Sequence, residues 1–154
     1  MRIILLLGFL IATTSLSAQS LNKYLSGQWK GYITLGSLEA TSGQPFELFL
    51  EVRGGKIKGR TLIHLDDGEI IEMEVTGQLY HDHSLRLQEL EFVQTEGFEA
   101  KPTHYKKYQF VHHRSIFESD NKLDGYWQEI MDTPFGKKRR RGRIVLNKIV
   151  PKKA

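Results

Sequence analysis

The chain has 154 residues, a formal net charge of +4 and no cysteine, which excludes disulfide frameworks, thiolate zinc sites and cysteine nucleophiles. All 18 acidic residues lie in residues 19–136 together with twelve lysines and arginines, whereas residues 137–154 carry nine basic residues and no acid. The body is therefore acidic, with a net charge near −6, and the basic balance comes from the C-terminal segment. This distribution argues against nucleic-acid binding by the body.

The first 18 residues have the order of a secretory signal peptide. Arg2 precedes an apolar run over residues 3–11, and a stretch of mostly small and polar residues ends at Ala18. The apolar run is shorter than the about 20 residues that span a bilayer. We expect residues 1–18 to be removed, which leaves residues 19–154 as one exported, soluble domain of periplasmic or extracellular type, most typical of bacteria. A retained membrane anchor is the alternative.

From Gly27 onward, apolar and polar residues alternate with the period of two that is typical of strands. Turn signals rich in Gly, Asp and Asn separate the apolar runs. The apolar phase slips between Leu87 and Leu90, which predicts a β-bulge. Only residues 20–25 are compatible with a short helical turn. The predicted strands cover residues 28–35, 45–53, 57–65, 69–80, 85–94, 105–118, 123–131 and 141–150.

The short connections between these strands predict antiparallel pairing of each strand with the next one. Every strand has one apolar face, and closing the sheet buries that face and removes the exposed edges. The expected fold is therefore all-β, a single antiparallel up-and-down barrel of about eight strands. An eight-stranded barrel has an interior that side chains can fill, or that can hold one small ligand.

Three features together resemble the calycin superfamily, which contains the lipocalins and the fatty-acid-binding proteins. They are Gly27-x-Trp29 on the first strand, the meander of eight strands, and the arginines of the last strand. In that superfamily a Gly-x-Trp motif starts the barrel, and an arginine of the last strand packs across the tryptophan ring. The resemblance implies that Arg141 or Arg143 stacks on Trp29 and closes that end of the barrel.

The sixth predicted strand carries the strongest candidate ligand site. Tyr108, Phe110, His112 and Arg114 share one face by alternation. If that face points inward, it forms an aromatic wall with an arginine suited to a carboxylate or phosphate head group. The alternative is that the opposite face, which includes Val111, points inward and this set faces solvent.

Two residues of the seventh predicted strand are expected to complete this site. Trp127 and Glu129 share a face, so both side chains would line the same cavity. The alternative is that Trp29 and Trp127 plug the two ends of the barrel, each packed over a glycine of a strand.

Other candidate sites have a structural explanation that we prefer. His81 and His83 are spaced as two metal ligands, but they lie in a predicted hairpin turn, and no zinc spacing accompanies them. Two carboxylate pairs suggest acid–base chemistry, but a spacing of two in a half-buried strand usually marks its wet face; these are Glu72 with Glu74 and Glu89 with Glu91. No nucleophile elbow, phosphate loop or zinc-protease motif occurs in the sequence. We expect no cofactor and no enzymatic activity.

A run of basic residues precedes the last strand and consists of Lys137, Lys138, Arg139 and Arg140. It is expected to contact an anionic lipid or glycan surface, or to be a solvated loop that pairs with the acidic body. The sequence thus favours a non-enzymatic protein that binds a small, partly hydrophobic ligand with an anionic head. The alternative is a filled scaffold that docks on an anionic surface or a protein partner through the basic segment.

Overall fold

The computed structural model describes residues 21–35, 43–66, 68–93, 104–112, 122–130 and 139–150. Within these residues a short helix, residues 21–25, precedes eight strands. The strand bounds agree with the predicted ones within a few residues, and the part of the sixth predicted strand from residue 113 to 118 lies outside the described residues. The strands are β1 Gly27–Ile33, β2 Gln44–Arg53, β3 Lys56–His64, β4 Ile70–Leu79, β5 Ser84–Phe92, β6 Lys106–His112, β7 Lys122–Glu129 and β8 Arg141–Lys148.

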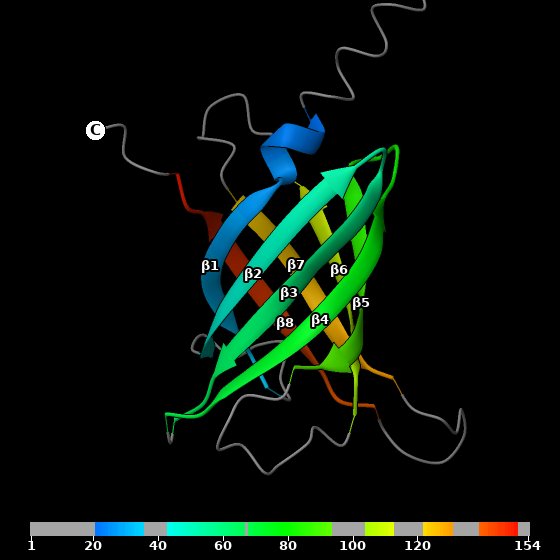
Figure 1. Cartoon of the computed structure of the whole chain (residues 1–154). Coiled ribbons are helices and arrows are strands. Elements are labelled where there is room, and N and C mark those ends of the chain that lie inside the picture. The colour runs from blue at the N-terminus through cyan, green and yellow to red at the C-terminus, as the bar shows by residue number, and fades with distance from the viewer. Residues whose placement is uncertain are drawn as a thin grey trace, which may run out of the picture.

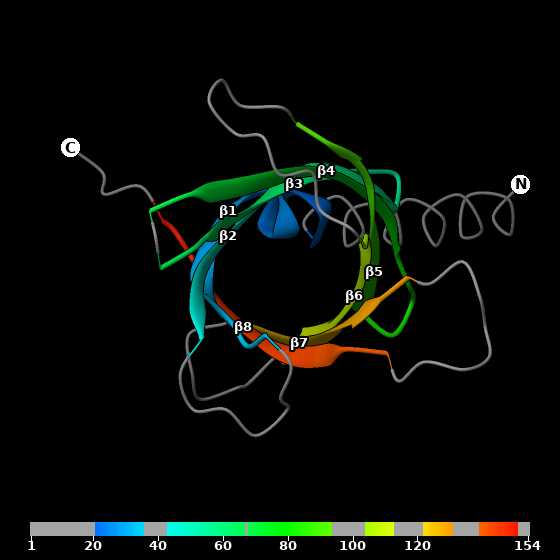
Figure 2. The same ribbon diagram turned by 90° about the horizontal axis from the view of Figure 1, so that it is seen from below.

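The strands form a closed antiparallel barrel in sequence order (Figure 1). Each strand pairs with the next, and β1 also pairs with β8 over Trp29–Lys148 to Ile33–Ile144. Seen from below, the strands make a complete ring (Figure 2). The expected fold class, an all-β up-and-down barrel of eight strands, is confirmed. Among the described residues, no helix is long and apolar enough to cross a membrane.

Alternation along each strand fills the barrel interior with apolar side chains. On β2, Phe46, Leu48, Leu50 and Val52 are buried, while Glu51 between them faces solvent. The same rule holds on β6, where Tyr108 and Phe110 are buried and Val111 is 44% exposed. The interpretation in which Tyr108 and Phe110 point into the barrel is therefore correct. The buried side chains form one continuous cluster inside the ring.

The turns form where the sequence allows positive φ angles. Gly54 and Gly55, which join β2 to β3, have φ angles of 57° and 77°, the region that glycine enters without a steric penalty. In the β4–β5 hairpin, His83 has a φ of 63°, and its N–H donates a hydrogen bond to the carbonyl oxygen of Tyr80. The turn predicted over residues 81–84 is confirmed.

The helix of residues 21–25 lies across one end of the barrel, which we call the helix end (Figures 1 and 2). Leu25 and Trp29 are fully buried there, and the indole Nε1 of Trp29 donates a hydrogen bond of 3.0 Å to the carbonyl oxygen of Leu25. Tyr24 meets Trp29 edge to face, with ring centroids 6.3 Å apart. The tryptophan thus ties the helix to the core.

The cation over Trp29 is Lys148, which corrects the expectation for Arg141 or Arg143. Lys148 pairs with Trp29 in the β1–β8 register, and its Nζ lies 5.5 Å from the Trp29 ring and 4.6 Å from the Tyr24 ring. Arg143 lies farther along β8 and binds Asp124 through its Nε and Nη2, at 3.2 and 2.7 Å. Arg141 is exposed. Register, not residue type, selects which cation reaches the ring.

The predicted bulge lies in β5 and changes which acids are buried. Val75 pairs with Glu89 and Glu74 pairs with Glu91, so Leu90 is the extra residue and is 52% exposed. Glu89 therefore stays in the inward phase of β5, whereas Glu91 faces solvent. The expectation that Glu89 and Glu91 share the wet face is wrong for Glu89.

Candidate binding site at the polar end of the barrel

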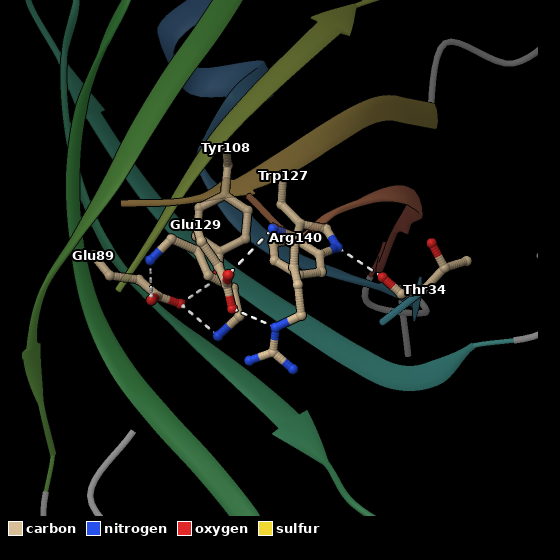
Figure 3. Close-up of polar contacts among 7 residues, drawn as sticks. Thr34, Glu89, Tyr108, Trp127, Glu129 and Arg140 are labelled. Carbon is tan, nitrogen blue, oxygen red and sulfur yellow. Dashed lines mark hydrogen bonds and ion pairs between the residues drawn. The ribbon is translucent and has the colours of Figure 1, made fainter. Parts of the chain in front are cut away.

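Ionisable and aromatic side chains gather inside the end of the barrel opposite the helix. This group, which we call the polar end, lies where β5 and β7 finish and β6 and β8 begin. Figure 3 shows six of its seven residues labelled, with the hydrogen bonds and ion pairs that join them. Its members are Thr34, Glu89, Lys106, Tyr108, Trp127, Glu129 and Arg140.

Glu89 is the most enclosed acid of the group, with 2% of its surface exposed. Its carboxylate accepts a hydrogen bond from the Tyr108 hydroxyl and one of 2.6 Å from the backbone N–H of Lys106. The Nζ of Lys106 lies 3.7 Å from the same carboxylate. Burial raises the pKa of Glu89, and the Lys106 charge and the Tyr108 hydrogen bond oppose this rise without cancelling it.

Tyr108 links this carboxylate to the aromatic core. Its ring lies 6.0 Å from Phe46 and stacks on Phe110 at 6.3 Å, measured between centroids. Burial raises the pKa of Tyr108 well above its ordinary value, and the charge of Glu89 adds to this effect. The phenol therefore stays protonated and donates its hydrogen to Glu89 across the physiological pH range.

Thr61 is a buried polar group next to Tyr108. Thr61 is fully buried, and its hydroxyl lies beside the Tyr108 phenol, where it opposes a small part of the rise in the pKa of that group. Within the described part of the chain, however, the Thr61 Oγ1 has no hydrogen-bond partner. A buried hydroxyl without a partner costs about 1–3 kcal/mol, so such groups usually contact a ligand or an ordered water.

Glu129 forms the second acidic centre of the polar end. Its side chain is 8% exposed and accepts a hydrogen bond of 2.6 Å from the Nε of Arg140, whose side chain is 66% exposed. The backbone N–H of Arg140 donates a second hydrogen bond of 3.2 Å. Arg140 therefore lies between Glu129 and solvent. Of the other residues of the predicted basic patch, Arg139 is exposed, and Lys137 and Lys138 lie outside the described residues.

Trp127 closes the side of the group next to β8. Its Nε1 donates a hydrogen bond of 2.7 Å to the carbonyl oxygen of Thr34, and its ring lies 5.9 Å from the Nζ of Lys106. The indole packs over Gly142, where an added Cβ would lie 2.3 Å from Nε1. Both proposed roles for Trp127 fit this position, because the ring is fixed at the barrel end and also borders Glu129 on β7.

The structure brings together part of the predicted ligand site. Tyr108, Phe110, Trp127 and Glu129 all point into the barrel, as expected if they share a site. His112 ends β6, but its side chain lies outside the description, as does the whole of Arg114.

Sequence reasoning missed Glu89 and Lys106. The signal for Glu89 was present, because Leu85, Leu87 and Glu89 keep one phase and only Leu90 breaks it. Lys106 gave no signal, since its role arises from pairing across β5 and β6 and from closure of the ring. Of the other carboxylate pair, Glu74 is exposed, and Glu72 accepts a hydrogen bond of 3.0 Å from Arg60 on the outer surface.

The polar end is suited to binding through hydrogen bonds and charge. It contains two buried carboxylates, a protonated phenol and the buried Thr61 hydroxyl beside aromatic rings. No cluster of three or more His, Asp or Glu residues that would hold a metal occurs in the part of the chain that the structure describes. No model of a known protein family and no curated protein matched the chain in our comparisons.

Proposed function

We propose that this chain is a calycin-like, non-enzymatic binding protein that takes up a small, partly hydrophobic ligand at the polar end of its barrel. The order of strands and the Gly-x-Trp start of β1 support the calycin assignment. The signal-peptide pattern of residues 1–18 supports export to the periplasm or the exterior. The apolar body of the ligand would contact the Tyr108 and Trp127 rings, and its polar head would contact the acids beside them.

The observation that carries this proposal is the burial of polar groups where a filled scaffold would place apolar ones. Burying a carboxylate costs several kcal/mol unless its partners compensate, and the raised pKa of Glu89 indicates incomplete compensation. Close by, the buried Thr61 hydroxyl has no partner of hydrogen-bond geometry among the residues that the structure describes. A buried acid with a shifted pKa, such as Glu89, is a candidate for a binding group.

The chemistry of the described residues also bears on the polar head of the ligand. The sequence suggested an anionic head because of His112 and Arg114, whose side chains the structure does not describe. The described residues instead supply Glu89 and Glu129, with Lys106 and Arg140 already paired to them. These acids favour a head that donates hydrogen bonds, such as a hydroxyl or an ammonium group.

Native mass spectrometry of the chain purified from its own host tests whether the barrel retains a ligand. We expect an added mass that is lost on denaturation. Replacing Glu89 with Gln should reduce the retained fraction, whereas Glu91→Gln, an exposed acid two residues along the same strand, should not. Equal retention by both variants would place the ligand elsewhere.

Titration with three probes of equal chain length tests the head group. Dodecylamine, dodecanol and dodecanoate would be added below their micelle concentrations, and Trp127 fluorescence would be read in a Trp29→Phe background, where it is the one remaining indole. We expect the amine or the alcohol to bind about tenfold more tightly than the acid, the worth of one charged hydrogen bond. If dodecanoate binds most tightly, the ligand has an anionic head group, as the sequence suggested. If no probe binds, the proposal is contradicted.

A further inference from the structure

A second region with binding chemistry lies on the outside of the barrel. A groove crosses the outer surface from β4 to β8, and the two rows of side chains described below line it. These strands lie side by side along one part of the barrel wall (Figure 2). The polar end and its ligand play no part in this surface, because the side chains of the two rows point away from the barrel interior.

The first row runs straight across four strands. Gln88 on β5 pairs with Lys107 on β6, Lys107 pairs with Gln128 on β7, and Gln128 pairs with Arg141 on β8. All four side chains are exposed. Neighbouring strands are about 4.8 Å apart, so the row presents alternating amides and cations at that spacing.

The second row lies two residues along the strands from the first. It consists of Gln78 on β4, Arg86 on β5, Gln109 on β6 and Tyr126 on β7, each paired with the next. The Arg86 guanidinium lies over an aromatic ring, 5.2 Å from the centroid of Tyr80. The Tyr126 ring is 56% exposed, so its face is accessible from solvent.

The charge of this groove differs from that of the chain around it. Arg86, Lys107 and Arg141 line it, and no acid occurs among its described lining residues. The body of the chain has a net charge near −6, so this concentration of cations does not follow from composition. Beside Tyr126 on β8, Arg143 is paired to Asp124 and is therefore less available to an anion.

We propose that these two rows bind a linear acidic polysaccharide. Glutamine amides both donate and accept hydrogen bonds, which matches sugar hydroxyls, while arginine and lysine bind carboxylate or sulfate groups. Tyr126 offers a ring against which a sugar face can pack. The regular spacing of the rows suits a repeating chain more than a single small anion.

Other anionic partners fit the rows less well. Single-stranded nucleic acid is usually bound on several aromatic platforms along a densely basic groove. Here two exposed tyrosines stand among four glutamines, and the ring of one of them, Tyr80, already stacks with Arg86. A membrane surface is usually met by cations with apolar side chains that insert beside them, and neither row contains an aliphatic side chain. Arg141, the first residue of β8, belongs to the first row, whereas the other seven positions come from β4 to β7.

Binding measurements with named polymers test this proposal. The full chain would be titrated with polygalacturonate, heparin, dextran and oligo(dT), and with vesicles that contain phosphatidylglycerol. We expect polygalacturonate or heparin to bind and dextran to bind at least about tenfold more weakly, because dextran lacks the anionic groups. Absence of binding by both acidic polysaccharides would overturn the proposal, as would tighter binding of oligo(dT) or of the vesicles.

Matched variants separate the groove from the overall charge. Lys107→Gln with Arg141→Gln removes two charges from the groove, and Lys58→Gln with Arg60→Gln removes the same two residue types from the outside of β3. We expect the first pair to weaken polysaccharide binding at least about tenfold and the second to change it less than about threefold. Gln88→Ala with Gln128→Ala should also weaken binding without altering charge. Equal losses from the two charge pairs would show that binding follows net charge alone.

Discussion

The two ends of the barrel solve the same packing problem in different ways. At the helix end, Leu25 and Trp29 complete an apolar core, and Lys148 places its charge over the Trp29 ring. At the polar end, the inward-pointing side chains near the end of the barrel include two buried acids, Glu89 and Glu129. A barrel of this size can evidently be closed by apolar residues and a short helix. The inward positions at the other end instead hold acids that are hydrogen-bonded to their neighbours.

The largest expected effect is at the helix end. Replacing Trp29 with Ala should lower the free energy of unfolding by about 3–5 kcal/mol, because a fully buried ring and its hydrogen bond to Leu25 are lost together. Urea denaturation followed by circular dichroism measures this change. Tyr126→Ala, at an exposed aromatic position, should cost less than about 0.5 kcal/mol. Similar losses of unfolding free energy in the two variants would contradict the full burial of the Trp29 ring.

A single methyl group should disturb the polar end. Gly142→Ala places a Cβ about 2.0 Å from the carbonyl oxygen of Thr34 and 2.3 Å from Trp127 Nε1, so the hydrogen bond between them must break. We expect a loss of about 1–3 kcal/mol in unfolding free energy and a changed near-ultraviolet signal from Trp127. Gly54→Asn is the control, because a Cβ there meets nothing within 4 Å and asparagine tolerates its φ of 57°. An unchanged Gly142→Ala variant would contradict the described position of the indole.

The pH dependence of stability should distinguish the buried acid from its exposed neighbour. The pKa of Glu89 is raised in the folded state, so the folded chain binds more protons than the unfolded chain between the ordinary value of 4.5 and the raised one. Its contribution therefore favours the folded state below pH 4.5, declines as the pH rises through that window, and stays lower above it.

Glu89→Gln should remove this decline, whereas Glu91→Gln should retain it. At pH 7 we expect the Glu89→Gln variant to differ from the natural chain by no more than about 1 kcal/mol, since the lost charge is offset by lost contacts to Lys106. Denaturation midpoints measured from pH 4 to pH 8 give the comparison. A decline of the same size in both variants would assign the pH dependence to another group.

The smallest expected effect concerns the cation at the helix end. Lys148→Met keeps the length of the side chain but removes its charge from the Trp29 and Tyr24 rings, which should cost about 0.5–1 kcal/mol. Lys148→Arg should retain most of the stability, because a guanidinium also stacks on aromatic rings. Lys58→Met, at an exposed position of β3, should cost less. Thermal denaturation of the four chains at one ionic strength measures these differences.

The sequence predicted the barrel well because its fold depends on local patterns. Alternation places Phe46 and Tyr108 on inward faces, and the glycines at 54 and 55 mark a hairpin that forms as expected. Those features involve residues close together in the chain. The phase slip near Leu90 was also visible as a bulge.

The site was harder to predict because it depends on register between strands. Lys148 and Arg143 are both cations of β8, but only pairing with β1 decides that Lys148 reaches Trp29. Glu89 and Glu91 have the same side chain and are two residues apart, but only the exact residue that bulges decides which acid is buried. A shift of one residue reverses the side of the sheet to which a side chain points.

The pairing of β1 with β8 has a consequence for how the molecule is made. A growing chain cannot close its ring until the residues of β8 have been synthesised, because β1 has no other partner on that side. Until then, β1 and β7 each present an unpaired edge, which invites association with other chains. Contacts between distant parts of a chain also form slowly. Synthesis that stops within β8 should therefore yield a product that aggregates rather than a shortened barrel.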